Sequence, residues 1–471
     1  MKTYFTLCLL FLYTSLFSQY QLKKERLALD ETLKIAVFEI KDNLFTHGQT
    51  FVWDNREFTL LKTDSQYILK HPDTNTSYTA YNTPLPLIQI DAPNGIVNEP
   101  KRFASIDYAD SAKTLNSYAG IEIRGSSSRY FAKESYDINF YTNYQKGLNR
   151  NVQLGNMRTD DDWILDALYN EPLRLRSHLS FALWKKIHTP SYLNKAPKAQ
   201  SGIDTQHCEV FINGHYKGVY LLTEQVDRKL LQLAKEDQTG IRGELFQGSA
   251  YQGAVTFDSI PVVKNYLRSW GGHDIEYPYP NDTPWDNLCE FTDAIIQGDD
   301  DTFAKAVETQ VNLPNIIDYF LFINALRAPD NLGKNIYLAR YDRGEPYFYI
   351  PWDLDGTFGT IFNGEELDVT TDFLDNGLLR KLLAKNPENF IGRFKARWKE
   401  LRNNELETNA LLKWQKKHYQ KLITSGVYER EKIAWPSLDY GTQRIEYMNN
   451  WTQKRLQFLD TYIENITPKT D

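Results

Sequence analysis

The pattern of apolar residues changes along the chain. Between about residues 85 and 260, short runs rich in β-branched and aromatic residues follow one another, as in GIEIRG, SYDINFY and HCEVFINGHYKGVYLLTE. Such runs predict strands, and the Asn-Gly pair in the last of them predicts a tight hairpin. After about residue 285, apolar residues recur at helical spacing instead. The sequence therefore predicts an α+β protein with a β-rich N-terminal half and a helix-rich C-terminal half, arranged as two lobes.

Three segments modify this division. Residues 20–84 are expected to form a β-containing N-terminal extension, in which LALDETLKIAVFEI has the spacing of a short helix. EPLRLRSHLSFALWKKI predicts one helix within the β-rich part, and NIYLARYD and PYFYIPWDLD predict paired strands within the helical part. We expect one larger domain over residues 85–465, with its β-rich lobe at about 85–260 and its helical lobe at about 285–465.

The first residues, MKTYFTLCLLFLYTSLFSQY, have an early lysine, an apolar stretch and then a serine. This layout is typical of a signal peptide. We predict that residues 1–19 are removed and that the protein is exported to the periplasm, the cell surface or the medium. No other segment approaches 18 consecutive apolar residues, so no membrane span is expected. The remaining cysteines, Cys208 and Cys289, allow one disulfide.

The charge balance argues against nucleic acid as a partner. The net charge is -7, and the chain has no long basic run. Hydrophobic residues make up 41% of the chain, which is enough for a packed core and argues against disorder.

Two polar clusters in the second half point to a chemistry. Asp330 and Asn335 lie in a loop with proline and glycine, and Asp353 and Asp355 follow the apolar run YFYIPW. The order D-x4-N, strand hairpin, D-x-D-G is that of a kinase catalytic loop and its metal-binding aspartate. We expect Asp353 and Asn335 to bind Mg²⁺ or Mn²⁺ and Asp330 to accept the proton of an acceptor hydroxyl. Asp355 either binds metal too or caps the following turn.

A simpler interpretation of the same residues is a set of metal-free turns in which the side chains cap backbone amides. Against it, a buried strand is expected to hold Asp353 in place through Phe348, Ile350 and Trp352. Strand alternation would direct Trp352 and Asp353 to opposite sides, with the aspartate facing a cleft between the lobes.

Five segments, in order, resemble those of the CotH family of atypical secreted protein kinases, first known from spore coats. They are GIEIRGSSSRYFAKESYDINF, DDDWIL, CEVFINGHYKGVYLLTEQVDR, NLGKNIYLARYD and YIPWDLDGTFG, and the resemblance runs from about Leu85 to Arg455. It implies a divergent, bilobal protein-kinase-like fold that binds ATP with Mg²⁺ or Mn²⁺. It also implies transfer of the γ-phosphate to serine or threonine of secreted or cell-surface proteins. We expect a monomer.

The resemblance also assigns a nucleotide site. Arg124, Gly125 and Ser126 match a family turn whose amides and hydroxyls can face phosphates. Lys133, expected on the strand that follows, would reach the α- and β-phosphates, as a kinase strand lysine does. Glu224 would pair with Lys133 or bind metal.

Two other kinds of protein are alternatives to a kinase. Glu134 and Gln247 stand where relatives usually carry lysines, so a catalytically silent surface or adhesion protein on the same scaffold is the alternative. Retention of Asp330, Asn335 and Asp353 favours the enzyme. A metal-dependent phosphatase or nuclease is disfavoured because the chain has 8 histidines and none is near the aspartates in sequence.

Overall fold

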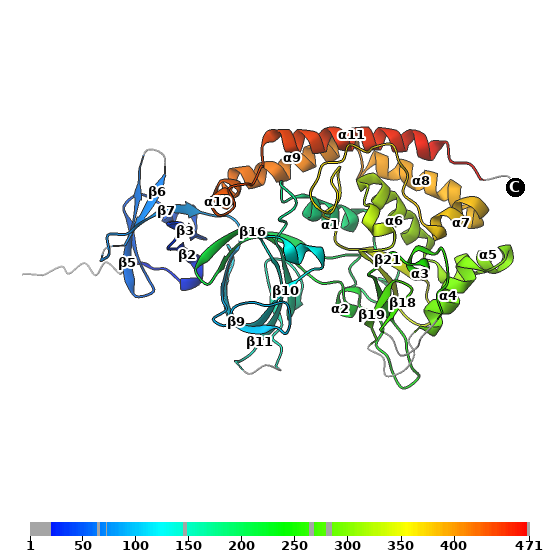
Figure 1. Ribbon diagram of the computed structural model, residues 1–471, viewed down its shortest axis with the longest axis horizontal. Helices are drawn as coiled ribbons and strands as arrows, with labels where there is room; N and C mark the ends of the chain where they lie inside the picture. The colour runs from blue at the N-terminus through cyan, green and yellow to red at the C-terminus, as the bar shows by residue number, and fades with distance from the viewer. Residues whose placement is uncertain are drawn as a thin grey trace, which may run out of the picture.

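The computed structural model describes residues 20–63, 66–71, 73–144, 148–262, 268–278 and 285–468. The expected signal peptide, residues 1–19, lies outside the described residues. The described chain is elongated, and an N-terminal sheet, a barrel and a second mixed unit follow one another along its length (Figure 1). It is an α+β protein with a β-rich N-terminal half, as the sequence predicts.

The N-terminal residues form a seven-stranded sheet in the order β1-β4-β5-β6-β7-β3-β2. Its strands are β1 (Tyr20–Gln21), β2 (Leu27–Asp30), β3 (Ile35–Phe38), β4 (Gln49–Trp53), β5 (Arg56–Lys62), β6 (Tyr67–Lys70) and β7 (Ser77–Asn82).

The helix predicted for LALDETLKIAVFEI is wrong, because this segment forms β2 and β3, an antiparallel pair. Between them, Asp30 Oδ1 accepts hydrogen bonds of 2.8 Å from the backbone amides of Thr32 and Leu33, which closes the turn. All four residues of β3 are buried, since the strand lies between the core of its own sheet and the barrel. A strand buried on both faces shows no alternation, and its apolar run therefore imitates a helix.

Seven strands close into a barrel in the order β10-β11-β14-β16-β15-β8-β9. They are β8 (Leu87–Asp91), β9 (Arg102–Ala109), β10 (Thr114–Arg124), β11 (Ser135–Tyr141), β14 (Asp162–Asp166), β15 (Thr205–Ile212) and β16 (His215–Thr223), while β12 (Val152–Gln153) and β13 (Thr159–Asp160) pair separately. The predicted hairpin joins β15 and β16. Its Asn213 and Gly214 both have positive φ, 50° and 74°, as a type I′ turn requires.

A second sheet of five strands has the order β18-β19-β17-β20-β21. Its strands are β17 (Glu244–Gly248), β18 (Ser269–Trp270), β19 (His273–Tyr277), β20 (Ile336–Arg340) and β21 (Tyr347–Pro351). The antiparallel pair β20 and β21 is the one predicted between helices. β17 comes from residues expected in the β-rich lobe, yet it pairs with β20.

Helices cover the second sheet and extend back along the barrel (Figure 1). They are α1 (Arg176–Ile187), α2 (Arg228–Leu231), α3 (Gly253–Thr256), α4 (Asp286–Ile296), α5 (Asp300–Gln310), α6 (Leu313–Leu326), α7 (Gly377–Lys385), α8 (Phe390–Asn403), α9 (Thr408–Thr424), α10 (Val427–Ala434) and α11 (Thr442–Glu464). α1 is the helix predicted within the β-rich half, and α6, which is almost wholly buried, packs against β21.

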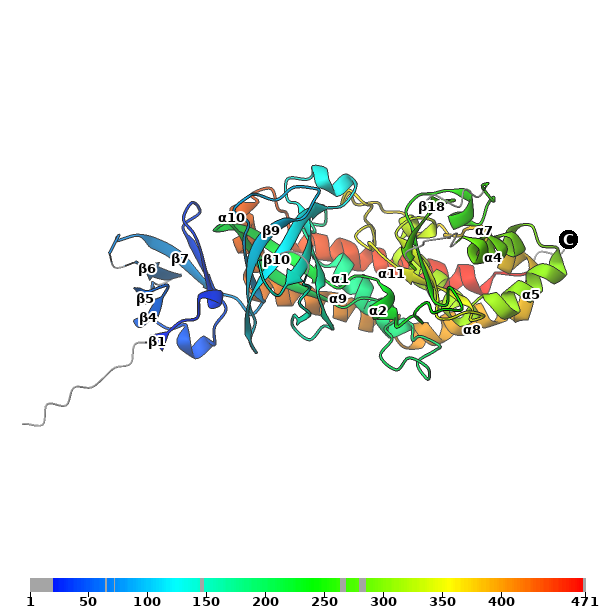
Figure 2. The ribbon, with the colours of Figure 1, turned by 90° about the horizontal axis from the view of Figure 1, so that it is seen from below.

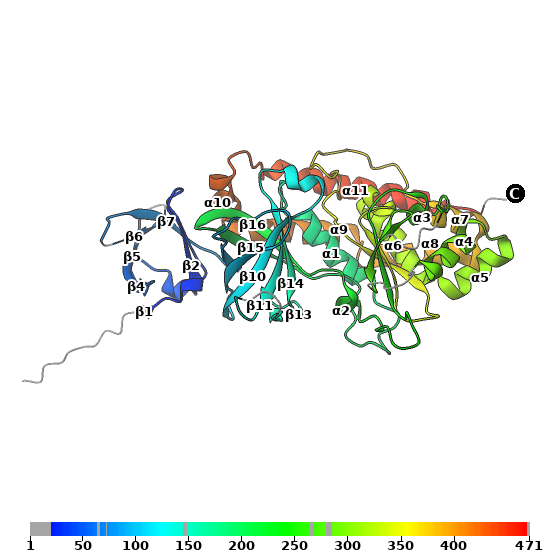
Figure 3. The same cartoon turned by 60° about the horizontal axis from the view of Figure 1, so that its bottom comes forward.

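The C-terminal helices lie along both the barrel and the second sheet (Figures 2 and 3). Figures 2 and 3 show α9 and α11 running behind the barrel and the second sheet. The short helix α10 between them packs against β16 of the barrel. Residues near position 430 therefore lie beside strands that are some 200 positions earlier in the sequence.

The two cysteines for which the sequence allows a disulfide do not form one. Cys208 is buried and Cys289 is half-buried, and both are free thiols. Within the part of the chain that the structure describes, no helix has both the length and the apolar character needed to cross a membrane.

Candidate active site

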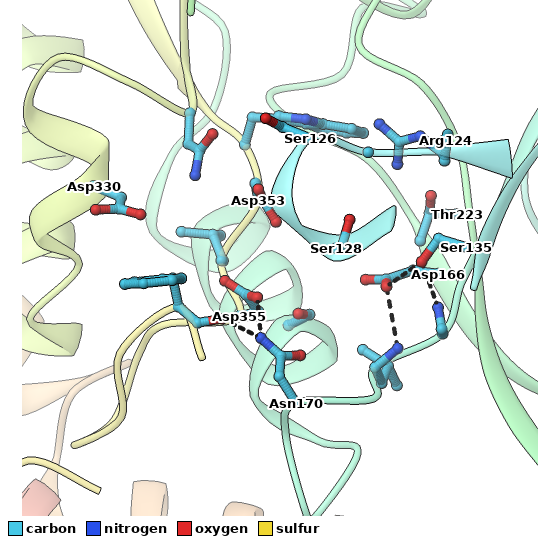
Figure 4. A pocket seen from close by; sticks show the side chains of 18 of the residues that line it. Arg124, Ser126, Ser128, Ser135, Asp166, Asn170, Thr223, Asp330, Asp353 and Asp355 are labelled. Carbon is cyan, nitrogen blue, oxygen red and sulfur yellow. Dashed lines mark hydrogen bonds between the residues drawn. The ribbon is translucent and has the colours of Figure 1, made fainter. Parts of the chain in front are cut away.

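A cleft of about 770 Å³ opens between the barrel and the second sheet. Arg124 and Asp166, at the ends of β10 and β14, line one side, and Asp330 and Asp353 line it from loops of the helical half. Figure 4 shows Asp353 between Asp330 and Arg124. All the site residues predicted from the sequence except Glu224 line this cleft, so the fold brings together groups that are more than 200 positions apart.

The glycine turn lies at the mouth of the cleft. Arg124 is the last residue of β10, and its guanidinium carbon lies 5.7 Å from the centre of the Trp352 ring. Gly125 has φ +109°, and a Cβ at this position would collide with the Ser128 hydroxyl. Ser126 is exposed at the cleft. The turn therefore requires glycine, and its polar groups face the space that a ligand would occupy.

The predicted ion pair between Lys133 and Glu224 is wrong. Glu224 is buried, and its carboxylate accepts hydrogen bonds from the backbone amides of Arg158 at 2.7 Å and Asp204 at 2.9 Å. Both oxygens of Glu224 are therefore used to hold two loops beside the end of β16. The carboxylate does not line the cleft.

Lys133 lies just before β11, not on it, and its ammonium turns into the protein. The ammonium donates hydrogen bonds to the backbone carbonyl of Val219 and, at 2.7 Å, to Oε1 of Glu431 on α10. It also lies 4.5 Å from the centre of the Tyr220 ring. The side chains of Lys133 and Glu431 have no exposed surface. Lys133 therefore borders the cleft without presenting its charge to it.

Glu431 is shared by two cations. Arg174 contacts the same oxygen through Nε at 3.2 Å and Nη2 at 3.1 Å. Burial lowers the pKa of Lys133 to about 8 although Glu431 raises it. Burial alone would raise the pKa of Glu431, but Arg174 and Lys133 hold it below the ordinary value. Lys133, Arg174 and Glu431 stay charged because the opposite charges stabilise one another in the buried site.

Asp330 and Asn335 lie in the loop between α6 and β20. Asp330 belongs to a short 3₁₀ turn, Pro329–Leu332, and its Oδ1 accepts a hydrogen bond of 3.1 Å from the Tyr251 hydroxyl. Asn335 has φ +55°, and its backbone amide donates to the carbonyl of Gly248 at 3.1 Å. The buried side chain of Asn331 donates to the backbone carbonyls of both Asn335 and Trp352. It thereby joins this loop to the one that carries Asp353.

Asp353 points into the cleft for a reason other than strand alternation. β21 ends at Pro351, and Asp353 has φ +49°, so the alternation expected for Trp352 and Asp353 does not apply. The expected apolar support is present, since Phe348, Ile350 and Trp352 are all buried. The left-handed backbone, held by the neighbouring loops, turns the carboxylate toward the open space, where it is exposed.

Asp355 and Asp166 add two carboxylates to the cleft. Asp355 Oδ2 accepts a hydrogen bond of 2.7 Å from Asn170 Nδ2 (Figure 4). Asp166 Oδ1 accepts from the backbone amide of Leu168 at 3.1 Å and from the Ser135 hydroxyl at 3.3 Å. Asp166 was not predicted from the sequence, although DDDWILD shares with YIPWD an acid directly after an apolar run.

These acids are held together against their repulsion. Although Asp353 is open to the cleft, desolvation by the surrounding protein raises its pKa to about 6, and Asp166 and Asp330 add to this, whereas Arg124 and Lys334 oppose it. Burial likewise raises the pKa of Asp355 well above its usual value, and the charge of Asp353 contributes. The cleft therefore carries negative charge that its own cations do not neutralise.

The donor set fits a divalent cation of the magnesium type. Carboxylate and amide oxygens are the ligands that Mg²⁺ and Mn²⁺ accept, and Asp353, Asp355 and Asn335 offer them. Among the described residues, the only three acids whose oxygens lie within 4.8 Å of one another are Asp160, Asp161 and Asp162. In that other group, Arg158 pairs with Asp160, and Lys229 pairs with Asp160 and Asp161. The cleft acids are more widely spaced, as in sites that complete the coordination with substrate phosphates.

These features define an α+β protein with an acidic ligand cleft between two units. The chain belongs to the CotH family, because the family model described as CotH kinase protein matches residues 121–459. It is similar to the inner spore coat protein H of Bacillus subtilis (strain 168), with 26% identity over 251 residues. The alignment covers 52% of this chain and 60% of that protein, so it spans less than two thirds of the relative.

Proposed function

We propose that the protein is an atypical protein kinase with a kinase-like fold, which transfers the γ-phosphate of ATP to serine or threonine. The observation that carries this proposal is the meeting of Asp330, Asn335 and Asp353 in one cleft with the turn at Gly125. The family description as a kinase supports it. No histidine is among the described residues that line the cleft, which disfavours a metal-dependent phosphatase or nuclease.

The residues divide the chemistry between them. Asp330 accepts the proton of the acceptor hydroxyl while the hydroxyl oxygen bonds to the γ-phosphorus and the bond to the bridging oxygen of ADP breaks. The Tyr251 hydroxyl donates a hydrogen bond to Asp330 Oδ1, so Oδ2 is the oxygen that would accept that proton. Asp353, Asp355 and Asn335 would hold Mg²⁺ or Mn²⁺, which neutralises phosphate charge when bound.

The acceptors we propose are secreted or cell-surface proteins. The N-terminal signal pattern supports export, and the name of the Bacillus subtilis relative places that protein in a spore coat. A location outside the cytoplasm is therefore part of the proposal.

Incubation with labelled ATP, Mn²⁺ and the secreted proteins of the source tests this function. Wild type should transfer phosphate, and Asp330→Asn should lose at least about a hundredfold in rate while its ATP affinity stays within about threefold. Asp301→Asn, an exposed acid on α5, is the matched control and should behave as wild type. Transfer by Asp330→Asn at the wild-type rate would show that Asp330 is not the base.

One observation favours the catalytically silent alternative. The lysine expected on the phosphates, Lys133, has its ammonium enclosed and paired with Glu431. A kinase of this type therefore needs another cation at the phosphates, or the cleft does not bind ATP.

A further inference from the structure

The cations of the cleft differ in whether other groups of the protein already bind them. Among the described residues that line it, three are basic: Arg124, Lys133 and Lys334. Lys133 is excluded as a phosphate ligand because Val219, Glu431 and the ring of Tyr220 surround its ammonium. Bringing it into the cleft would break its buried ion pair with Glu431, which is costly.

The other two cations are accessible. Lys334 and Arg124 are each half-buried, and neither head group has a hydrogen bond or ion pair to any other described residue. The guanidinium of Arg124 rests over the ring of Trp352, which restricts its position without using its donors. Both cations line the same cleft as Asp353.

The two cations come from different parts of the fold. The backbone amide of Lys334 donates to the carbonyl of Asp330 at 3.0 Å, so Lys334 lies in the same turn as the proposed base and directly before Asn335. Arg124 lies on the barrel, directly before the glycine turn. A phosphate that reacts beside Asp330 is therefore nearest to Lys334, and the phosphates that reach the glycine turn are nearest to Arg124.

We propose that Lys334 and Arg124, one from each side of the cleft, are the residues that contact the nucleotide phosphates. Lys334 contacts the γ-phosphate, and Arg124 contacts the α- and β-phosphates. This inference rests on the proposed kinase function and names the cations of its site. Lys133 is then a structural residue that ties the barrel to α10.

Calorimetry with Mg²⁺ and either ATP or ADP separates the two roles. Lys334→Met should weaken ATP binding about ten- to a hundredfold and ADP binding less than about threefold, since only ATP carries the γ-phosphate. Arg124→Met should weaken both by about tenfold or more. Lys413→Met, an exposed lysine on α9 outside the cleft, is the control and should change neither.

A second measurement uses the unaltered protein. Brief acetylation followed by mass spectrometry should modify Lys334, and ATP with Mg²⁺ should protect it, whereas Lys133 should stay unmodified with or without ATP. Modification of Lys133 that ATP suppresses, or wild-type ATP affinity in both Lys334→Met and Arg124→Met, would overturn the inference. No binding of ATP by wild type with either Mg²⁺ or Mn²⁺ would instead overturn the proposed function on which it rests.

Discussion

Lys133 and Glu431 form an ion pair of 2.7 Å with no exposed side-chain surface, although 298 positions separate them. The pair fastens α10 to the barrel, beside the backbone of β16. Arg174 completes the group from the segment before α1, so three distant parts of the chain meet at one carboxylate. The C-terminal helices are thus part of the structure that supports the cleft wall.

Loss of the shared carboxylate should be strongly destabilising. Glu431→Gln would leave Lys133 and Arg174 enclosed without a counter-charge, and breaking a buried pair in this way costs about 3–5 kcal/mol of unfolding free energy. Urea unfolding of the variant measures the loss. Glu429→Gln, an exposed acid on the same helix, should change stability by less than about 0.5 kcal/mol. A similar small effect at position 431 would mean that the pair contributes little.

Gly218 provides an independent test of the same contact. A Cβ at Gly218, which has φ +87°, would lie 2.8 Å from Glu431 Cγ, whereas a Cβ at Gly214, with φ +74°, has no atom within 4 Å. Gly214→Ala should therefore lower the unfolding free energy by about 1 kcal/mol, the strain of an alanine in left-handed backbone. Gly218→Ala should lower it by about 2–4 kcal/mol, because Glu431 must move as well. Equal losses in the two variants would show that Glu431 does not pack closely on β16.

Local patterns were sufficient to predict much of the fold. The Asn213-Gly214 hairpin, helix α1 and the pair β20 and β21 each have a short sequence signal, a turn dipeptide or a clear periodicity, and each is present. One exception is β3, whose burial on both faces removes the alternation by which a strand is recognised.

The site was predictable where an acid follows an apolar run, as at Asp353, or where residues share one loop, as at Asp330 and Asn335. The partner of Lys133 was not, because Glu431 is one of two acids on α10 and only the tertiary fold brings this helix to the barrel. The orientation of Asp353 was missed for a related reason. Its left-handed backbone depends on bonds from Asn331, which strand alternation does not include.

Asn170 should influence metal binding through Asp355. Its amide donates to Asp355 Oδ2 at 2.7 Å, and this bond lowers a pKa that burial and the charge of Asp353 raise. Asn170→Ala should therefore raise the pKa of Asp355 further and make protons stronger competitors of the metal. The Mn²⁺ concentration that gives half of the thermal stabilisation should rise several-fold at pH 6.5 and by less at pH 8.5. An unchanged Mn²⁺ response at both pH values would remove Asp355 from the metal site.

Asp353 should make the metal-free protein less stable as the pH rises. Its pKa is about 6 in the folded protein against an ordinary 3.8, so between these values the folded state binds more protons than the unfolded state. The unfolding free energy therefore falls from about pH 4 to pH 6 and stays lower above it. Because the carboxylate is open to the cleft and partly screened, we expect the loss to be about 1 kcal/mol rather than the full value of the shift.

Asp353→Asn removes this ionisation, and so the stability of the variant should depend less on pH and on metal than that of wild type. Without metal, Asp353→Asn should be the more stable protein above pH 6 and equal to wild type near pH 4. With excess Mn²⁺ at pH 7.5, the ionised Asp353 gains a counter-charge, so wild type should gain several degrees in melting temperature while the variant gains little. Thermal melts of both proteins at about pH 4 and at pH 7.5, each with Mn²⁺ or with a chelator, measure these differences between the variant and wild type. Parallel pH profiles and no metal response in wild type would mean that the acids of this cleft tolerate their repulsion without a cation, as the catalytically silent alternative requires.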